Sequence, residues 1–249
     1  MIAATTFKLS TIVVLVALTA LPAQPVMAED DAVRRAREAM VADVRDMWQL
    51  TRRETGSAAP DPVVMAVLGR VLRHEFVPHT SRNLAYANRP LPIGLGQTIS
   101  QPYIVALMTD LANAGPESRV LEVGTGSGYQ AAVLAEIAAE VYSIEIIAPL
   151  AESAAARLKR LGYRNVQVRH GDGYYGWEEQ APFDAILVTA AASHVPPPLV
   201  EQLAVGGRMV IPVGSGFAVQ QLVLVEKRPE GVVLEQILPV RFVPLTGGH

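Results

Sequence analysis

The spacing of hydrophobic residues divides the chain into three parts. A short apolar run occupies residues 12–18, close to the N-terminus. Apolar residues then recur every three or four positions over residues 31–55, which predicts an amphipathic surface helix. After residue 102, short apolar strands alternate with helical patterns. This alternation is typical of a parallel sheet with helices on both faces.

The same patterns predict the individual elements. Asp61 and Pro62 form a helix N-cap and first helical position. Residues 76–100 are rich in Pro, Gly and Asn and predict a long irregular segment, a type that is usually functional. Two C-terminal runs, 220–226 and 232–242, predict an antiparallel hairpin. Further helices are predicted at 61–73, 102–113, 128–139, 149–161 and 198–203, and further strands at 119–123, 141–145, 166–168, 184–188 and 208–213.

Composition excludes several classes of protein. The chain has 249 residues, half of them apolar, which suits one large domain with a substantial core. Its formal net charge of −3 leaves no basic excess for nucleic-acid phosphates, so we expect no nucleic-acid partner. The absence of cysteine excludes thiol catalysis and disulfides. The five histidines lack metal-ligand spacing, so we expect no metal centre.

The first 28 residues have the pattern of a secretory signal peptide. Lys8 precedes the apolar run, and small residues end at Ala28 before an acidic segment. Cleavage after Ala28 would leave residues 29–60 as an N-terminal helix and linker and residues 61–249 as the main domain. The apolar run is too short to span a bilayer, so we expect a periplasmic or secreted protein without stable membrane association. An uncleaved anchor, or a false extension of a cytoplasmic protein, is the alternative.

A glycine-rich turn follows the strand predicted at 119–123. It reads Glu122-Val-Gly124-Thr-Gly126-Ser-Gly128 and opens a helix. The dinucleotide fingerprint needs a glycine at position 129, where this chain has Tyr129, so an NAD-dependent oxidoreductase is disfavoured. A carboxylate at Glu122 would repel a phosphate and attract a cation. The pattern therefore favours a nucleoside with positive charge and no phosphate, which describes S-adenosylmethionine.

Two further acids follow the next strands. Glu145 ends the strand predicted at 141–145, where an acid accepts hydrogen bonds from ribose hydroxyls. Asp172 follows the strand at 166–168, and we expect it to accept from the adenine amino group while Gly173 leaves room for the ring. Taken alone, each of these two acids is better explained as a cap of a helix or turn. The three acids together lie where α/β folds bind ligands, which favours a common site.

The segment Leu-Pro-Ile-Gly-Leu-Gly-Gln-Thr-Ile-Ser-Gln-Pro at residues 91–102 resembles the protein-L-isoaspartate O-methyltransferase family. Supporting motifs occur in family order at 75–78, 171–173, 181–185, 206–208, 211–214 and 243–245, so the resemblance covers residues 62–246. It implies a class I, Rossmann-like, S-adenosylmethionine-dependent methyltransferase with a mostly parallel seven-stranded sheet. It also implies methylation of the α-carboxylate of L-isoaspartyl residues in damaged proteins. The ester then closes to a succinimide, whose hydrolysis partly restores aspartate.

The resemblance also implies which residues form the site. It places the active-site serine at Ser100. A carboxylate is already ionised at neutral pH, so we expect Ser100 to orient the substrate and no general base to be needed. The alternative for Ser100 is a plain helix N-cap. The cofactor contacts implied by the resemblance are Ile93, Gly94, Gly96, Ser100, Glu122, Gly124, Thr125, Gly126, Ser127, Gly128, Glu145, Asp172, Gly173 and Thr246.

Two other functions compete with repair methylation. One is a class I methyltransferase acting on a small molecule or another protein group, and the run at 98–102 argues against it. The other is a non-catalytic exported binding protein with the same fold, which the intact acids and glycines argue against. We expect a monomer that acts on damaged proteins or peptides. Export leaves open how S-adenosylmethionine, which is made in the cytosol, reaches the enzyme.

Overall fold

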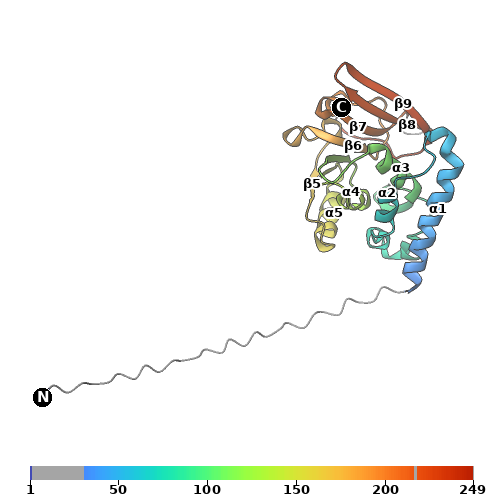
Figure 1. Cartoon of the computed structure of the whole chain (residues 1–249), viewed down its shortest axis with the longest axis vertical. Coiled ribbons are helices and arrows are strands. Elements are labelled where there is room, and N and C mark those ends of the chain that lie inside the picture. The colour runs from blue at the N-terminus through green and yellow to red at the C-terminus, as the bar shows by residue number, and fades with distance from the viewer. Residues whose placement is uncertain (2–30, 216–217, 249) are drawn as a thin grey trace.

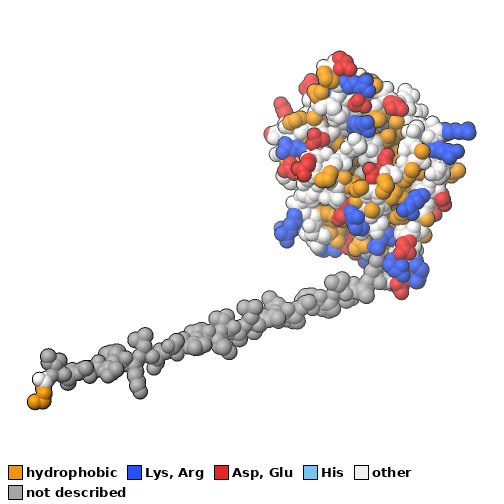
Figure 2. All heavy atoms as spheres, in the orientation of Figure 1, with side chains coloured by type: hydrophobic (Ala, Val, Ile, Leu, Met, Phe, Trp, Pro, Cys, Tyr) orange, Lys and Arg blue, Asp and Glu red, His pale blue; other side chains and the backbone are white. Residues whose placement is uncertain are grey.

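A computed structural model of the chain describes residue 1, residues 31–215 and residues 218–248 (Figure 1). The predicted signal peptide lies outside the described residues, apart from Met1. None of the helices in the described part of the chain combines the length and the hydrophobicity needed to cross a bilayer. Acidic and basic side chains are interspersed over the face of the molecule in Figure 2.

A seven-stranded sheet forms the centre of the fold, with strand order β5-β4-β3-β6-β7-β8-β9. The first five strands of this order are mutually parallel, whereas β8 runs antiparallel to β7, and β9 runs antiparallel to β8. The predicted α/β class, mostly parallel sheet and C-terminal hairpin are therefore confirmed. The bounds are β3 Arg119–Val123, β4 Glu140–Glu145, β5 Val166–His170, β6 Phe183–Val188, β7 Leu203–Val213, β8 Gln220–Arg228 and β9 Gly231–Val240.

Helices cover both faces of this sheet. On β3, the side chain of Val120 packs into one hydrophobic cluster with α1 to α5, whereas Leu121 and Val123 pack into a second cluster with Leu199 of α6. This split follows from the alternation of side chains along a strand. Helix α1 packs against α3 and β9, and Figure 1 shows it along one side of the molecule. The bounds are α1 Asp31–Thr55, α2 Pro62–Leu68, α3 Pro102–Ala112, α4 Tyr129–Ala135, α5 Ala148–Arg160 and α6 Pro197–Gln202.

Two predicted helices are shorter in the structure. Helix α2 ends at Leu68 because Gly69, a poor helix former, is followed by a turn that leads into the 3-10 segment Arg73–Phe76 (η1). Helix α4 ends at Ala135 because the chain turns back toward the sheet, and β4 begins at Glu140. In both cases the tertiary path of the chain overrides the helical pattern.

The prediction that residues 76–100 are irregular was partly wrong. A 3-10 segment runs from His79 to Leu84 (η2), and a small hairpin follows, made of β1 (Leu91–Gly94) and β2 (Gln97–Ile99). The two residues between its strands, Leu95 and Gly96, both have positive φ, at 54° and 76°. Positive φ at both central positions is what a tight two-residue hairpin turn requires. The hairpin carries the chain directly to Ser100.

Candidate functional site

A pocket lies at the carboxyl ends of β3, β4 and β6, which is where open α/β sheets bind ligands. Its wall combines segments that are far apart in the sequence, among them the end of the β1–β2 hairpin and the chain after β9. The predicted site residues that line it are Ser100, Glu122, Gly124, Thr125, Gly126, Ser127, Glu145, Gly173 and Thr246. The predicted residues outside its lining are Ile93, Gly94, Gly96, Gly128 and Asp172.

The glycine-rich turn has a backbone that only glycines adopt readily. Gly124, Gly126 and Gly128 have φ values of +98°, +52° and +86°. A Cβ on Gly124 would also crowd the Thr189 hydroxyl, which donates to the carbonyl oxygens of Val123 and Gly124 at 3.0 and 2.7 Å. The turn therefore brings bare backbone to the pocket wall, where a ligand can approach closely.

Glu145 holds this turn in place. Its Oε2 accepts a hydrogen bond from the Gly126 N–H at 2.7 Å, and its Oε1 accepts one from the Ile147 N–H at 2.9 Å. An ionised carboxylate has about four acceptor positions, so roughly two are left for a ligand. Glu145 thus connects the glycine-rich turn to the segment after β4. Its remaining acceptor positions are free for the ribose hydroxyls that the sequence analysis expected there.

Glu122 is the second acid in the pocket and is completely buried. Its Oε2 accepts from the Ser143 hydroxyl, and its Oε1 has no hydrogen-bond partner among the described residues. Burial raises the pKa of Glu122 to about 8, while the Ser143 hydrogen bond opposes the rise and the charge of Glu145 adds to it. Burial therefore favours the protonated carboxyl in the ligand-free protein, whereas the sequence suggested a standing charge. A cationic donor placed at Oε1 would favour the ionised form instead. An orphaned buried oxygen calls for a ligand that donates to it.

We expect Glu122 to make the cofactor-free protein less stable at high pH. Because its folded-state pKa of about 8 exceeds the usual 4.5, the folded protein holds a proton that the unfolded chain releases between these values. The free energy of unfolding therefore falls as pH rises through this window, by on the order of a few kcal/mol. Urea unfolding at about pH 5 and about pH 8 should show this fall in the wild type and a clearly smaller one in Glu122→Gln. Equal falls in both would contradict the assignment.

Asp172 takes the turn-capping role that was the alternative reading. It is the N-cap of the 3-10 segment Gly173–Tyr175 (η3), and its Oδ1 accepts from the Tyr174 N–H at 3.0 Å. Its Oδ2 accepts from the Gly248 N–H at 3.0 Å, so the C-terminal residues lie against it. A Cβ on Gly173 would overlap Val123, so packing on β3 explains this glycine, where we expected room for a ring.

Ser100 lies between the hairpin and α3. The N-cap of α3 is Gln101, so the interpretation of Ser100 as a plain N-cap was wrong. Ser100 lines the pocket described above and also a second, adjoining cavity, as do Thr98, Thr189 and Val243. The other residues of the second cavity are Pro90, Gln101, Ile104, Val219 and residues 239–242. Ser100 is therefore placed where two ligands could meet.

Several residues of the site escaped the sequence analysis. Thr189 directly follows β6, so the rule that pointed to Glu145 could have found it. Buried Arg73, which donates to the Ser100 carbonyl oxygen at 2.7 Å, gave no signal, because it lies 27 positions away in the sequence. Within the described ranges, no three histidine or acidic side chains gather as a metal site.

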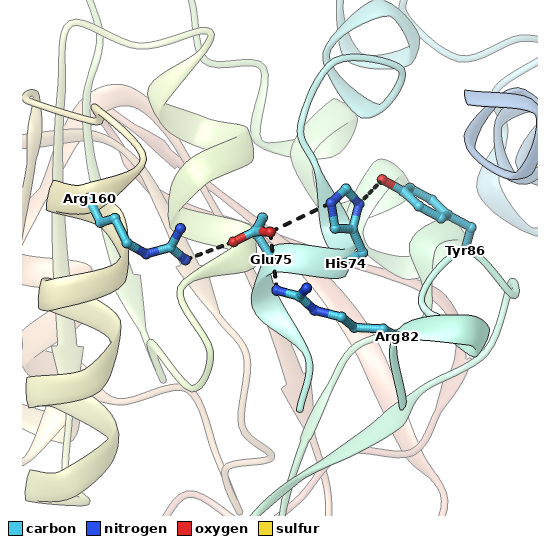
Figure 3. Close-up of polar contacts among 5 residues, drawn as sticks. All are labelled: His74, Glu75, Arg82, Tyr86 and Arg160. Carbon is cyan, nitrogen blue, oxygen red and sulfur yellow. Dashed lines mark hydrogen bonds and ion pairs between the residues drawn. The ribbon is translucent and has the colours of Figure 1, made fainter. Parts of the chain in front are cut away.

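A polar cluster around Glu75 joins segments that are far apart in the sequence (Figure 3). The Glu75 carboxylate pairs with Arg160 at 2.8 Å, with Arg82 at 3.2 Å and with His74 at 3.6 Å. The hydrogen bond from Arg160 is the main reason why the pKa of Glu75 is lowered. These contacts tie η1 and η2 to α5, and Arg157 of α5 donates to the Ser127 carbonyl oxygen at 2.8 Å. The cluster thereby braces the helix that holds the glycine-rich turn.

Comparison with known proteins decides the family. The model of the protein-L-isoaspartate(D-aspartate) O-methyltransferase family matches residues 46–249. The chain belongs to this family. The match begins inside α1, upstream of residue 62, where the resemblance in the sequence begins.

Individual family members are similar over most of their length. Protein-L-isoaspartate O-methyltransferase 2 of Syntrophobacter fumaroxidans is 65% identical over 223 residues, covering 89% of this chain and 90% of its own. The enzyme of the same name from Polaromonas sp. is 67% identical over 209 residues, covering 84% and 99%. A solved Plasmodium falciparum member of the family, in complex with S-adenosyl-L-homocysteine, has a TM-score of 0.69 and 28% identity, covering 84% of this chain and 98% of its own.

Proposed function

We propose that this protein-L-isoaspartate O-methyltransferase repairs damaged proteins by methylating the α-carboxylate of L-isoaspartyl residues. The observation that carries the proposal is that Ser100 joins two adjoining cavities, one of which contains the glycine-rich turn and Glu145. A cofactor in one cavity and an acceptor in the other can therefore meet beside Ser100. The test is methyl transfer to matched isoaspartyl and aspartyl peptides.

The first pocket fits S-adenosylmethionine. This cofactor supplies a methyl group made electrophilic by a positively charged sulfur. The free acceptor positions of Glu145 suit the ribose hydroxyls, and the orphaned Oε1 of Glu122 suits a cationic donor. The turn from Gly124 to Gly128 gives the backbone access that a bound nucleoside needs. Both carboxylates can accept hydrogen bonds from the cofactor directly, and both would repel a phosphate.

The residues of the site have to orient the acceptor and exclude water, and they need not remove a proton. The acceptor carboxylate is ionised at neutral pH, so no residue has to remove a proton from it. Ser100 orients the carboxylate in line with the methyl group, and the surrounding walls exclude water. Succinimide formation and its hydrolysis then proceed without the enzyme. This explains why the described site has an orienting hydroxyl and no paired base.

Replacing Ser100 by alanine is expected to lower kcat/KM for an isoaspartyl peptide by about 10- to 100-fold, the value of a hydrogen bond to a charged group. The dissociation constant of S-adenosylhomocysteine should change by less than about threefold, because other residues dominate that pocket. Steady-state kinetics and calorimetry measure the two effects. Full turnover in Ser100→Ala would show that the hydroxyl does not orient the substrate.

We infer that residues 1–28 direct export and that the mature enzyme is a monomer without a stable membrane association. The charge and apolar pattern of residues 8–28 supports export. The N-terminus of protein recovered from the periplasm should be Glu29. Recovery from the cytosol of a shorter chain, begun at a later start codon, would instead support the false-extension alternative. Sedimentation of the mature chain should give the mass of one copy, and a dimer would contradict the second inference.

A further inference from the structure

Arg73 is a fully buried cation without a counter-ion. Its side chain has no solvent exposure. Its Nε donates to the Ala85 carbonyl oxygen at 2.8 Å, and its Nη2 donates to that of Ser100 at 2.7 Å. Its guanidinium carbon lies 4.8 Å from the centroid of the Tyr129 ring. None of the ion pairs formed among the described residues includes Arg73, and its Nη1 has no hydrogen-bond partner among them.

This arrangement is unfavourable if its purpose is only structural. A buried charge that faces only neutral groups retains most of its desolvation penalty. A neutral amide could donate to the same carbonyl oxygens without that penalty. Desolvation indeed lowers the pKa of Arg73, although a guanidinium stays protonated at any physiological pH. The chain therefore holds a positive charge in its interior that nothing in its described residues neutralises.

The neighbours of Arg73 locate the effect of this charge. Ser100, whose carbonyl oxygen it binds, lines both cavities, and Tyr129, whose ring it contacts, lines the first. The charge thus lies directly behind the residue at which the acceptor carboxylate is expected. Little solvent lies between to screen it, so the field of a buried charge extends over several ångströms. Arg241 also lines the second cavity, but it is exposed and its charge is screened.

We propose that Arg73 is a positioning and specificity-determining residue, which fixes the backbone at Ser100 and supplies the buried charge that selects an ionised carboxylate over a neutral group there. This inference rests on the proposed function. The substrate carboxylate then acts as the counter-ion that Arg73 lacks. The two charges attract each other across Ser100 without direct contact. An amide of the same shape gains nothing from the charge.

The experiment compares two peptides that differ only in one group. One contains L-isoaspartate with its free α-carboxylate, and the other has this group replaced by a carboxamide. Calorimetry with S-adenosylhomocysteine present measures binding of each without turnover. The wild type should bind the carboxylate peptide at least about tenfold more tightly than the amide peptide. In Arg73→Met the ratio should fall to about one, and in the matched surface control Arg70→Met it should stay at the wild-type value.

Arg73→Lys distinguishes the effect of the positive charge from the effect of the several N–H donors of the guanidinium. It should keep the binding ratio within about threefold of the wild type while kcat falls, because lysine keeps the charge but holds fewer carbonyl groups. A folded Arg73→Met that keeps the wild-type ratio overturns the proposal. If Arg73→Met does not fold, loss of the ratio in folded Arg73→Lys overturns it equally. Collapse of the ratio in Arg241→Met would assign the selection to Arg241 and also overturn it.

Methyl transfer by the wild type distinguishes a failure of this inference from a failure of the proposed function. A wild type that transfers no methyl group to the isoaspartyl peptide overturns the proposed function, and the inference with it. A wild type that methylates the peptide normally, together with an unchanged binding ratio in the Arg73 variants, overturns the inference alone.

Discussion

Replacing Glu145 by alanine is expected to weaken cofactor binding by about 100-fold or more. The variant loses two hydrogen bonds from backbone N–H groups to a carboxylate, at Gly126 and Ile147. Hydrogen bonds to charged groups contribute about 1.5–3 kcal/mol each, and the variant also loses the acceptor positions that we propose for the ribose hydroxyls. Titration calorimetry with S-adenosylmethionine and with S-adenosylhomocysteine measures the effect.

Two further variants control this experiment. Glu145→Gln keeps one good acceptor oxygen and should lose less affinity than Glu145→Ala. Glu140, at the other end of β4, pairs with Arg119 at 2.9 Å on the partly exposed surface, so Glu140→Ala should bind the cofactor normally. Normal cofactor binding by folded Glu145→Ala would remove Glu145 from the site.

Replacing Trp48 by alanine is expected to lower the free energy of unfolding by about 3–5 kcal/mol. Trp48 is fully buried on α1 and packs edge-on against Tyr103 of α3, with the ring centroids 6.0 Å apart. Thr51 of the same helix hydrogen-bonds to the Tyr103 hydroxyl. The substitution therefore opens a cavity at the junction between the N-terminal helix and the helix that follows Ser100. Urea denaturation, monitored by far-UV circular dichroism, measures the loss.

The same helix provides the controls. Leu50 is 76% exposed, so Leu50→Ala should change the free energy of unfolding by less than about 0.5 kcal/mol. The indole N–H of Trp48 has no hydrogen-bond partner among the described residues. Trp48→Phe should therefore cost clearly less than Trp48→Ala, because it also removes an unsatisfied donor. Equal and small losses for Trp48→Ala and Leu50→Ala would mean that α1 does not stabilise the domain.

The sequence predicts the sheet well because parallel strands buried on both faces are continuous apolar runs. Local patterns fail where the fold ends an element early. Helix α2 stops at Leu68 although its apolar spacing continues, because the following residues turn so that Arg73 points into the core. The β1–β2 hairpin could not be predicted from the sequence, because its strands are short and its turn has Leu95, which is not glycine, at positive φ.

In the site, too, some features follow from local sequence patterns and others depend on tertiary contacts. Glu122, the glycine-rich turn and Glu145 were predictable because they follow strands whose carboxyl ends must converge. Two features depend on contacts across the fold, and no local pattern indicates them. One is the hydrogen bond from Arg73 to Ser100, and the other is the contact of Gly248 with Asp172. The buried state of Glu122, which sets its pKa, likewise follows only from the packing around β3.

The most direct test of the proposed function is methyl transfer by a chain that begins at Glu29, the N-terminus expected after cleavage. Purified enzyme is incubated with labelled S-adenosylmethionine and with two peptides that differ only in an L-isoaspartyl or an L-aspartyl linkage. We expect base-labile label on the isoaspartyl peptide alone. Cofactor binding without transfer to that peptide would contradict it and favour a small-molecule acceptor. Failure to bind the cofactor at all would favour a non-catalytic protein with the same fold.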